Sequence, residues 1–185
     1  MNHHKLLNSP TEVDSLDWGF AAEVAKRSGV EFNKCFHCRC CANGCPFYLA
    51  MDYAPHGVIR LIQLGLKKEV LECSTIWICV GCHTCAIQCP MAIDISALMD
   101  AVSQITMEEN AVVAEPDILN LHREVLHSIE RYGRTHKLEI MLRYKVQKGD
   151  WFGDLDVGLK MLAKRKLDLM PSRVKDIKKI KALFE

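Results

Sequence analysis

The sequence predicts a mostly α-helical fold that surrounds two cysteine-rich loops. One cysteine run of fixed spacing occurs twice, and apolar residues recur at helical intervals before, between and after the two runs. Both runs read Cys-x2-Cys-x2-Cys-x3-Cys-Pro, the first over residues 35–46 and the second over residues 79–90. This is the spacing of bacterial two-cluster ferredoxins. The chain is therefore expected to bind two [4Fe-4S] clusters.

The two runs are expected to exchange one ligand each. In two-cluster proteins of this spacing, the fourth cysteine of each run binds the other cluster. The predicted ligands of the first cluster are Cys35, Cys38, Cys41 and Cys89. Those of the second cluster are Cys79, Cys82, Cys85 and Cys45. Such crossed ligation would hold the two clusters side by side.

Zinc is the main alternative to iron-sulfur clusters, because four-cysteine sites built from Cys-x2-Cys pairs are common structural zinc sites. A zinc site needs neither the third cysteine of the run nor the proline after the fourth, yet both occur in each run. A disulfide framework fits less well still. His3, His4 and Lys5 precede no apolar segment of a secretory signal, so we expect a reducing, cytoplasmic location.

The chain has ten cysteines, two more than the clusters require. Cys40 competes with its neighbour for the third ligand position of the first run, but the second run has Thr84 at the equivalent of Cys40. Cys40 and Cys73 are both interpreted as small buried apolar side chains. His37 and His83 lie inside the loops and are interpreted as polar surface residues. The alternative is a hydrogen bond from either ring to a cluster sulfur, which would raise the reduction potential.

Helices are predicted before and between the runs. Leu16, Phe20 and Val24 recur at four-residue spacing before Gly29, as in a helix that ends at a glycine. A second helix is predicted from Pro55 to Leu66, with the proline in its first turn. Its apolar stripe consists of Val58, Ile59, Ile62 and Leu66. The segment between the runs is longer than a compact β-hairpin ferredoxin needs, which favours an α-helical ferredoxin.

Further helices are predicted after the second run. Asp94 is the expected N-cap of a helix that carries Ile95, Leu98, Met99, Val102 and Ile105 on its apolar face. Beyond Pro116, another apolar pattern comprises Ile118, Leu121, Val125 and Ile129 and ends near Gly133. One more helix is expected over residues 135–147, and glycines at 149 and 153 interrupt the pattern after it.

These elements predict an α-helical ferredoxin with helical extensions at both ends. We expect an N-terminal helical segment at residues 1–30, the two-cluster domain at 31–110 and a helical C-terminal extension with a basic tail at 111–185. No stretch approaches the roughly 18 uninterrupted apolar residues of a membrane helix, so no membrane span is expected.

The tail is basic although the whole chain is nearly neutral. From Lys160 to Glu185 there are nine Lys and Arg residues against three acidic residues, while the net charge of the chain is +1. Interpretations of the amphipathic stretch after Pro171 are, in order, a solvated charged helix, an anionic membrane surface and an acidic partner protein. Nucleic acid is disfavoured, because Phe184 is the one aromatic residue available for base stacking in this tail.

The sequence contains no motif for catalysis beside the cysteine runs. A dinucleotide fingerprint, a Walker loop and an H-E-x-x-H motif are all absent. A cubane with four thiolate ligands has no open coordination position for a substrate. The chain is therefore expected to transfer electrons within a larger enzyme.

Three segments resemble the iron-sulfur C subunit of the heterodisulfide reductase of methanogenic archaea. They are APHGVIRLIQLGLKKEVL (Ala54–Leu71), TIWICVGCHTCAIQCPMAIDISALMD (Thr75–Asp100) and, in the tail, GLKMLAKRKLDLMPSRVKDIKKI. The resemblance implies an electron-transfer chain whose two [4Fe-4S] clusters are held by the eight cysteines assigned above. It also implies that catalysis lies in other chains.

The partners that the resemblance implies are a catalytic B subunit, which cleaves the disulfide between coenzyme M and coenzyme B, and a flavin-containing A subunit, which bifurcates electrons. A hydrogenase or a formate dehydrogenase would supply electrons in methanogenesis. Subunits of anaerobic glycerol-3-phosphate dehydrogenase and of thiol:fumarate reductase are similar in the cluster region, but they carry a CCG-type domain that this sequence lacks. A relay subunit of sulfur metabolism, a free-standing ferredoxin and an interaction module stapled by metal remain alternatives.

Overall fold

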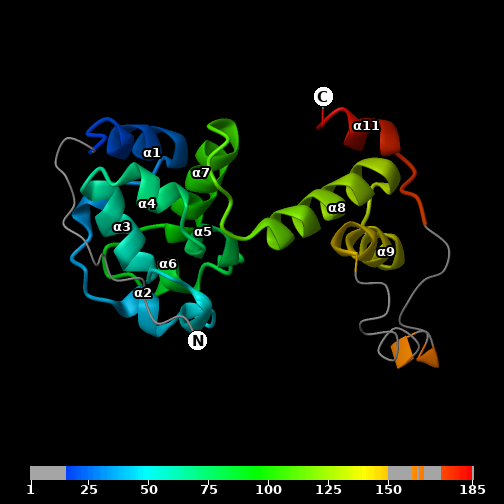
Figure 1. Cartoon of the computed structure of the whole chain (residues 1–185), viewed down its shortest axis with the longest axis horizontal. Coiled ribbons are helices and arrows are strands. Elements are labelled where there is room, and N and C mark those ends of the chain that lie inside the picture. Colours follow the sequence, from blue (N-terminus) through cyan, green and yellow to red (C-terminus); the bar gives the residue numbers. More distant parts are fainter. Residues whose placement is uncertain (1–15, 150–159, 162, 165–171, 185) are drawn as a thin grey trace. The chain divides into compact units, whose positions relative to one another are not determined.

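The computed structural model describes most of the chain as helices joined by loops. The described residues are 16–149, 160–161, 163–164 and 172–184, and they include no strand. The mostly α-helical prediction is thereby confirmed. The chain divides into two compact units, Met1–Glu115 and Pro116–Glu185 (Figure 1). The predicted helical segment before residue 16 and the predicted break at residues 150–153 lie outside the described residues, as do positions 165–171 of the tail.

The first unit contains both cysteine runs and is organised around its longest helix, α7. Its helices are α1 (Phe20–Ser28), η2 (Phe32–Lys34), α2 (Cys40–Asn43), η3 (Tyr48–Ala50), α3 (Pro55–Gln63), α4 (Lys67–Leu71), α5 (Thr75–Ile78), α6 (Thr84–Ile87) and α7 (Ile95–Glu108). Helix α7 packs against α1, α4, α5 and α6, and α1 also packs against α3. Helices α2 and α6 lie together at the end of the unit opposite α1 (Figure 1).

The apolar core of this unit is built mainly from the predicted helix stripes. Its fully buried side chains include Phe20 and Val24 of α1, Val58, Ile59 and Ile62 of α3, Val70 of α4, and Leu98, Val102 and Ile105 of α7. Burying one such side chain contributes roughly 1.5–3 kcal/mol. The helices that carry the cysteine loops are thus fixed by packing between α1, α3, α4 and α7.

Two helix ends differ from the predicted boundaries. Helix α1 begins at Phe20 and not at Leu16, because Asp17 Oδ1 accepts hydrogen bonds from the backbone N–H groups of Gly19 and Phe20 at 2.9 and 3.1 Å. Helix α3 ends at Gln63, short of Leu66. The chain then turns through Gly65, whose φ is +71°, into the separate helix α4. By contrast, α7 starts after Asp94 as predicted, with Asp94 Oδ1 accepting from the N–H of Ala97 at 3.1 Å.

Gly65 is needed both for its backbone conformation and for its lack of a side chain. Its carbonyl accepts a hydrogen bond from Asp17 N at 2.9 Å. A Cβ at position 65 would lie only 2.7 Å from the backbone oxygen of Asp17. The backbone of the turn between α3 and α4 therefore packs directly against the backbone of the segment that leads into α1.

Replacing Gly65 with Ala is expected to lower the free energy of unfolding by about 2–4 kcal/mol. About 1–2 kcal/mol of this comes from placing an alanine in the left-handed backbone conformation, and the rest from the clash with Asp17. Gly29→Ala is the matched control, since Gly29 has a φ of +66° but no atom within 4 Å of the place that a Cβ would take. It should lose only the strain component. Urea unfolding of the anaerobic chain followed by circular dichroism measures both; equal losses would contradict the close approach.

Asp52 links the loop after the first run to the start of the second. Its Oδ2 accepts from the N–H of Ser74 at 2.9 Å, and its Oδ1 accepts from the N–H and the hydroxyl of Thr75 at 3.1 and 2.7 Å. Oδ1 also accepts from the N–H of Tyr53 at 2.9 Å. The Ser74 and Thr75 donors lie at the N-terminus of α5, where backbone N–H groups lack partners within the helix. Asp52 thus serves as a cap for the helix that leads into Cys79.

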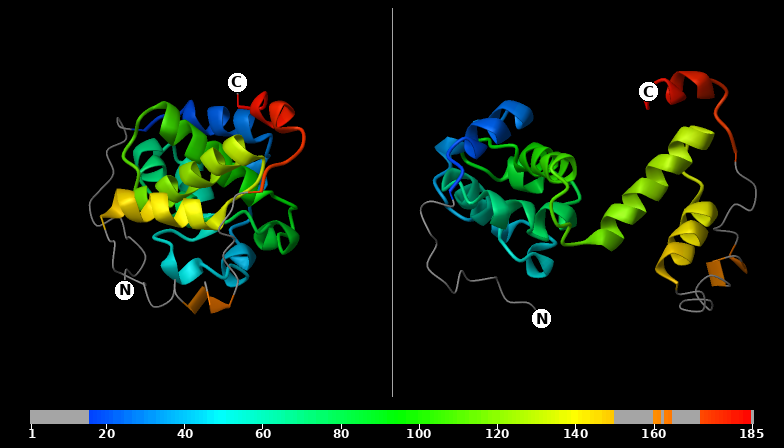
Figure 2. Two further views of the ribbon diagram at one scale, coloured as in Figure 1. Left: turned by 90° about the vertical axis from the view of Figure 1, so that its right-hand side faces the viewer. Right: turned by 45° about the horizontal axis from the view of Figure 1, so that its top comes forward.

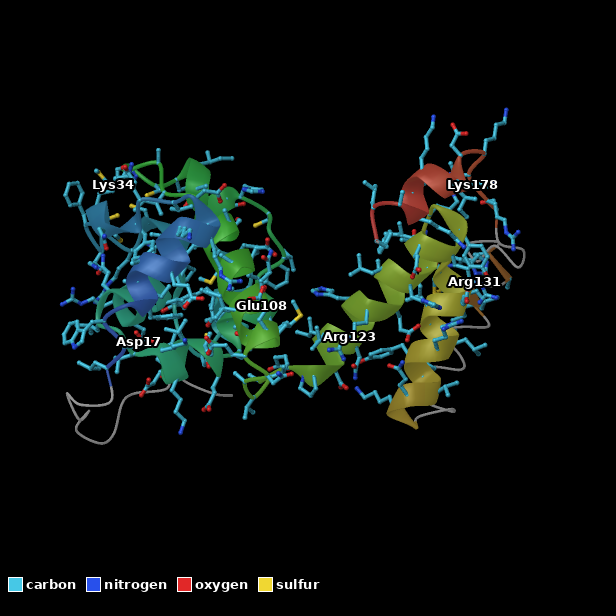
Figure 3. All side chains as sticks on the ribbon, turned by 90° about the horizontal axis from the view of Figure 1, so that it is seen from above. Asp17, Lys34, Glu108, Arg123, Arg131 and Lys178 are labelled. Carbon is cyan, nitrogen blue, oxygen red and sulfur yellow. The ribbon has the colours of Figure 1, made fainter. Side chains whose placement is uncertain are left out.

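A charged surface joins α1, α4 and α7 on the outside of the unit. Lys67 Nζ lies 2.6 Å from Glu109 Oε1 and 3.6 Å from Asp17 Oδ2, and Arg27 Nη2 lies 2.6 Å from Glu108 Oε2. Asp17 and Glu108 are labelled in Figure 3. Because these groups are partly exposed, water and salt screen the attraction within each pair. They add little stability beside the apolar core.

The second unit is a helical pair with the tail packed on it. Its described helices are α8 (Pro116–Tyr132), α9 (Lys137–Lys148) and α11 (Ile177–Lys181) (Figure 2). Helix α8 packs against α9 and α11. Both predicted helices of this region are present, and α8 ends at Tyr132, immediately before Gly133. Between α8 and α9, Gln147 Nε2 donates to the largely buried Glu124 at 2.7 Å.

The described part of the basic tail packs on its own chain. Val174 N donates to the carbonyl of Tyr132 at 3.0 Å. A Cβ on Gly133 would lie 2.8 Å from Val174 Cβ and 2.9 Å from Ile180 Cδ1, so the tail crosses directly over this glycine. Lys178, Lys179 and Lys181 of α11 remain exposed. None of the helices in the described ranges is long and apolar enough to cross a membrane.

Candidate functional site

The two cysteine loops have the same backbone conformation. Between the first and second cysteines of each run, one residue has a positive φ. It is His37 (+53°) in the first loop and Gly81 (+62°) in the second. The residue after the second cysteine is also left-handed, Arg39 (+67°) in one loop and His83 (+57°) in the other. A one-turn helix, α2 or α6, follows each of these residues. The sequence repeat is therefore a structural repeat.

The repeated helices α2 and α6 pack on each other at equivalent positions. Gly44 N donates to the carbonyl of Cys40 at 3.2 Å, and Gln88 N donates to that of Thr84 at 3.1 Å. A Cβ on Gly44 would overlap the side-chain amide of Gln88. The two loops meet without space for a side chain at position 44.

One cavity is lined by three cysteines of the first run and the last cysteine of the second. These are Cys35, Cys38, Cys41 and Cys89. Its walls also include Cys40, His56 in the first turn of α3, and the apolar residues Ile59, Ile93 and Ile95. Five cysteines, the four predicted ligands and Cys40, thus line an otherwise largely apolar space.

A second cavity has the reciprocal composition. It is lined by Cys79, Cys82, Cys85 and Cys45. Ser96 in the first turn of α7 lines it, as do Phe47, Val80 and Met99. These are the same two sets of cysteines that the spacing predicts, while their role as cluster ligands stays a prediction. Among the described residues, no three His, Cys, Asp or Glu side chains converge as the ligands of a single metal ion would.

The interior thiols of the two sets are neutral in the free chain at pH 7. Burial raises the pKa of Cys41 to about 11. Burial is also the largest influence on Cys79 and Cys85, and the pKa of each is raised. Metal ligation requires the thiolate, so binding at these positions would release protons.

The outer thiols have the opposite shift. The hydroxyl and the backbone N–H of Thr84 lower the pKa of Cys82. The backbone N–H and the thiol of Cys40 lower the pKa of Cys38. Cys38 and Cys82 are also exposed to solvent. Each set therefore has one accessible, more acidic thiol at its mouth.

Polar groups around both cavities suit a negatively charged, sulfur-rich group. His37 N donates to Cys35 Sγ at 3.4 Å. The first turns of α3 and α7 line the first and second cavities through His56 and Ser96, and a helix N-terminus carries a partial positive charge. Ser96 Oγ is buried and has no hydrogen-bond partner in the described residues. Four thiols, apolar walls and unused donors fit a [4Fe-4S] cluster in each cavity.

The two remaining cysteines occupy different environments. Cys73 is only 1 % exposed, and burial raises its pKa to about 12, as fits an inert thiol in the core. Cys40 is partly exposed and lies at the edge of the first cavity. It therefore differs from the buried apolar side chain expected from the sequence.

The two loop histidines contact neighbouring polar groups. His37 Nε2 lies 3.1 Å from Gln63 Oε1, and His83 Nδ1 lies 3.6 Å from Asp94 Oδ1. The His83 side chain is 59 % exposed. These contacts fit the interpretation of both histidines as polar surface residues.

Exposed apolar side chains lie in and near the cysteine loops in the sequence, and two of them line the cavities. Phe36, which lines the first cavity, is 73 % exposed, and Val80, which lines the second, is 61 % exposed. Leu49 and Ile87 are 90 % and 83 % exposed. Apolar surface of this kind is typical of protein contact sites.

Comparison with known protein families gives a match over the segment that contains both loops. Residues 31–93 match the 4Fe-4S dicluster domain. Curated relatives extend the similarity beyond this domain. The iron-sulfur C subunit of the CoB-CoM heterodisulfide reductase of Methanopyrus kandleri is 35 % identical over 101 residues, 55 % of this chain and 50 % of the relative.

Two further relatives carry related names. The C subunit of the H2:CoB-CoM heterodisulfide,ferredoxin reductase of Methanothermobacter marburgensis is 30 % identical over 81 residues, 44 % of each chain. A protein of Archaeoglobus profundus, described as similar to the heterodisulfide reductase C subunit, is 32 % identical over 116 residues, 62 % of this chain and 58 % of the relative. The chain is similar to the C subunit of heterodisulfide reductase. It spans about half the length of the curated relatives that it matches.

This similarity confirms the resemblance drawn from the sequence.

The sequence does not reveal the role of two polar residues that line the second cavity, Thr84 and Ser96. Thr84 enters the sequence prediction only as the counterpart of Cys40. Ser96 lies two residues after the predicted N-cap Asp94, so its place in the first turn is predictable. Its contact with a cavity is not, since that depends on how α7 packs beside the second loop.

Proposed function

We propose that this chain is the electron-transfer subunit of a CoB-CoM heterodisulfide reductase. In this proposal the first cluster is held by Cys35, Cys38, Cys41 and Cys89, and the second by Cys79, Cys82, Cys85 and Cys45. Bound there, [4Fe-4S] clusters would supply one-electron reduction and oxidation. The chain itself would position them and shield them from water.

The observation that carries the proposal is the composition of the two cavities. Each is lined by three cysteines of one run and the last cysteine of the other. The match to a dicluster domain and the names of the relatives point in the same direction. We assign the cluster-binding domain to residues 31–110, with a helical segment before it and a helical extension with a basic tail after it.

The proposed partners follow from the similarity to the C subunit. Electrons would pass from a flavin-containing A subunit through this chain to a catalytic B subunit, which reduces the disulfide of coenzymes M and B in methanogenesis. A hydrogenase or formate dehydrogenase would be the primary donor, in the cytoplasm. The exposed Phe36 and Val80, beside the solvent-facing Cys38 and Cys82, mark where electron-transfer partners would approach most closely.

Anaerobic purification of the native chain from its source cells tests this function. We expect a flavin subunit and a disulfide-reducing subunit to co-elute in stoichiometric amounts, identified by mass spectrometry. Iron on this chain should reach about eight atoms, as two [4Fe-4S] clusters contain. Bound zinc without iron would refute the proposal. An iron-loaded chain without partners would instead indicate a free-standing ferredoxin.

A further inference from the structure

We propose that the hydroxyl groups of Thr84 and Ser96 raise the reduction potential of the second cluster, the one assigned to Cys45, Cys79, Cys82 and Cys85. This inference rests on the proposed function, because it presupposes that a cluster occupies this cavity. It assigns these two residues a role in setting the potential, separate from ligation.

Thr84 is placed to donate a hydrogen bond to a ligand sulfur. Its Oγ1 lies 3.5 Å from Cys82 Sγ, within the range of hydrogen bonds that involve sulfur. In a cluster Cys82 is a thiolate and can only accept, so the threonine hydroxyl must be the donor. Thr84 is the first residue of α6 and is held there by the left-handed His83 before it.

Ser96 offers a second hydroxyl from a different element. The residue is 8 % exposed, and its Oγ is buried without a hydrogen-bond partner. It lines the same cavity as Cys85, one of the four cysteines assigned to the second cluster. A buried hydroxyl without a hydrogen-bond partner is destabilising. A sulfur atom in the cavity would provide the missing acceptor.

These hydrogen bonds act on the redox equilibrium through charge. Reduction adds one electron and therefore one negative charge to the cluster, and no bond forms or breaks. A donor aimed at the sulfurs stabilises the more negative state more strongly, which raises the potential.

The first loop differs at the position equivalent to Thr84. There the residue is Cys40, whose thiol lies beside Cys38 and is a weaker donor than a hydroxyl. The backbone donors are alike in the two loops, since the N–H groups of His37 and Gly81 both point to the first cysteine of their run. The difference at this position therefore lies in the side chains.

The test is a redox titration of the full chain, reconstituted with iron and sulfide, reduced with dithionite and followed by electron paramagnetic resonance. The reduction step that disappears from the titration of a Cys79→Ser chain is assigned to the second cluster. We expect this step to move to lower potential in Thr84→Val and in Ser96→Ala, and further in the double variant. Thr84→Ser retains the hydroxyl and should keep the wild-type potential.

Cys40→Val is the matched control in the first loop, and it should leave the step of the second cluster in place. Iron content and circular dichroism establish that each variant is folded and loaded. If Thr84→Val and Ser96→Ala both bind full iron and keep the wild-type potential, the inference is wrong and the proposed function stands. A wild-type chain that binds no iron would contradict both the inference and the proposed function.

Discussion

Replacing Cys45 with Ser is expected to remove the second cluster and leave the first intact. Cys45 belongs to the first run in sequence, but it lines the cavity of Cys79, Cys82 and Cys85. Because the second cluster would lose one of its four thiolate ligands, we expect iron to fall from about eight atoms per chain to about four. Iron analysis and the visible absorption of the anaerobic chain measure this loss.

Double variants separate crossed from uncrossed ligation. Adding Cys79→Ser to Cys45→Ser should cost no further iron, since both residues would serve the same cluster. Adding Cys35→Ser to Cys45→Ser should remove nearly all iron. The reverse pattern would mean that each run holds its own cluster. Cys73→Ala is the control outside both cavities and should bind the wild-type amount of iron.

Replacing Asp52 with Ala is expected to lower the free energy of unfolding by about 3 kcal/mol, because several partly buried donors lose one acceptor together. The N–H groups of Ser74 and Thr75 would have no other acceptor at the start of α5. That helix leads directly into Cys79, so the second cluster should also become easier to lose. Unfolding in urea and the rate of iron loss to a chelator measure the two effects.

The same carboxylate should give a stabilisation that does not vary with pH near neutrality. Burial tends to raise the pKa of Asp52, but hydrogen bonds from Ser74, Thr75 and Tyr53 outweigh it, and the pKa is lowered. The unfolded value is about 3.9, so the stabilisation is complete above that pH and is lost as the pH falls through the folded pKa. The stability difference between wild type and Asp52→Asn should therefore be constant from about pH 5 to pH 8.

Asp117→Asn is a suitable control for these measurements. Asp117 pairs with Lys148 at 2.9 Å on an exposed surface of the second unit, where water and salt screen the attraction between the two charges. It should change stability little. A wild-type advantage over Asp52→Asn that grows as the pH falls from 8 to 5 would show that the folded carboxyl has a raised pKa and not a lowered one.

The sequence predicts those features that depend on local pattern. The cysteine spacing predicts two sets of four thiols, and the apolar stripes predict α3, α7, α8 and α9. Helix ends set by neighbouring residues are also predictable, as with Gly29, Asp94 and Gly133. These signals are encoded within a few residues of one another, so no knowledge of tertiary packing is needed to interpret them.

Features that depend on distant contacts could not be predicted. The close approach of the Gly65 backbone to that of Asp17 joins residues far apart in the sequence, and no periodicity in residues 55–66 reveals it. The cap that Asp52 provides to α5 joins residues far apart in sequence. The place of Ser96 in the wall of the second cavity likewise depends on how α7 packs beside α6.

The contact between Gly44 and Gln88 limits how far the two halves of this domain can resemble each other. These residues occupy equivalent positions of the repeat, and the amide of Gln88 fills the space where a side chain at position 44 would begin. With glutamine in both places, the two amides would compete for one volume. With glycine in both, a gap would remain. If the domain arose by duplication of one loop, divergence at this pair of positions lets the Gln88 amide stay where it lies, whereas two identical loops would require one of the two amides to move.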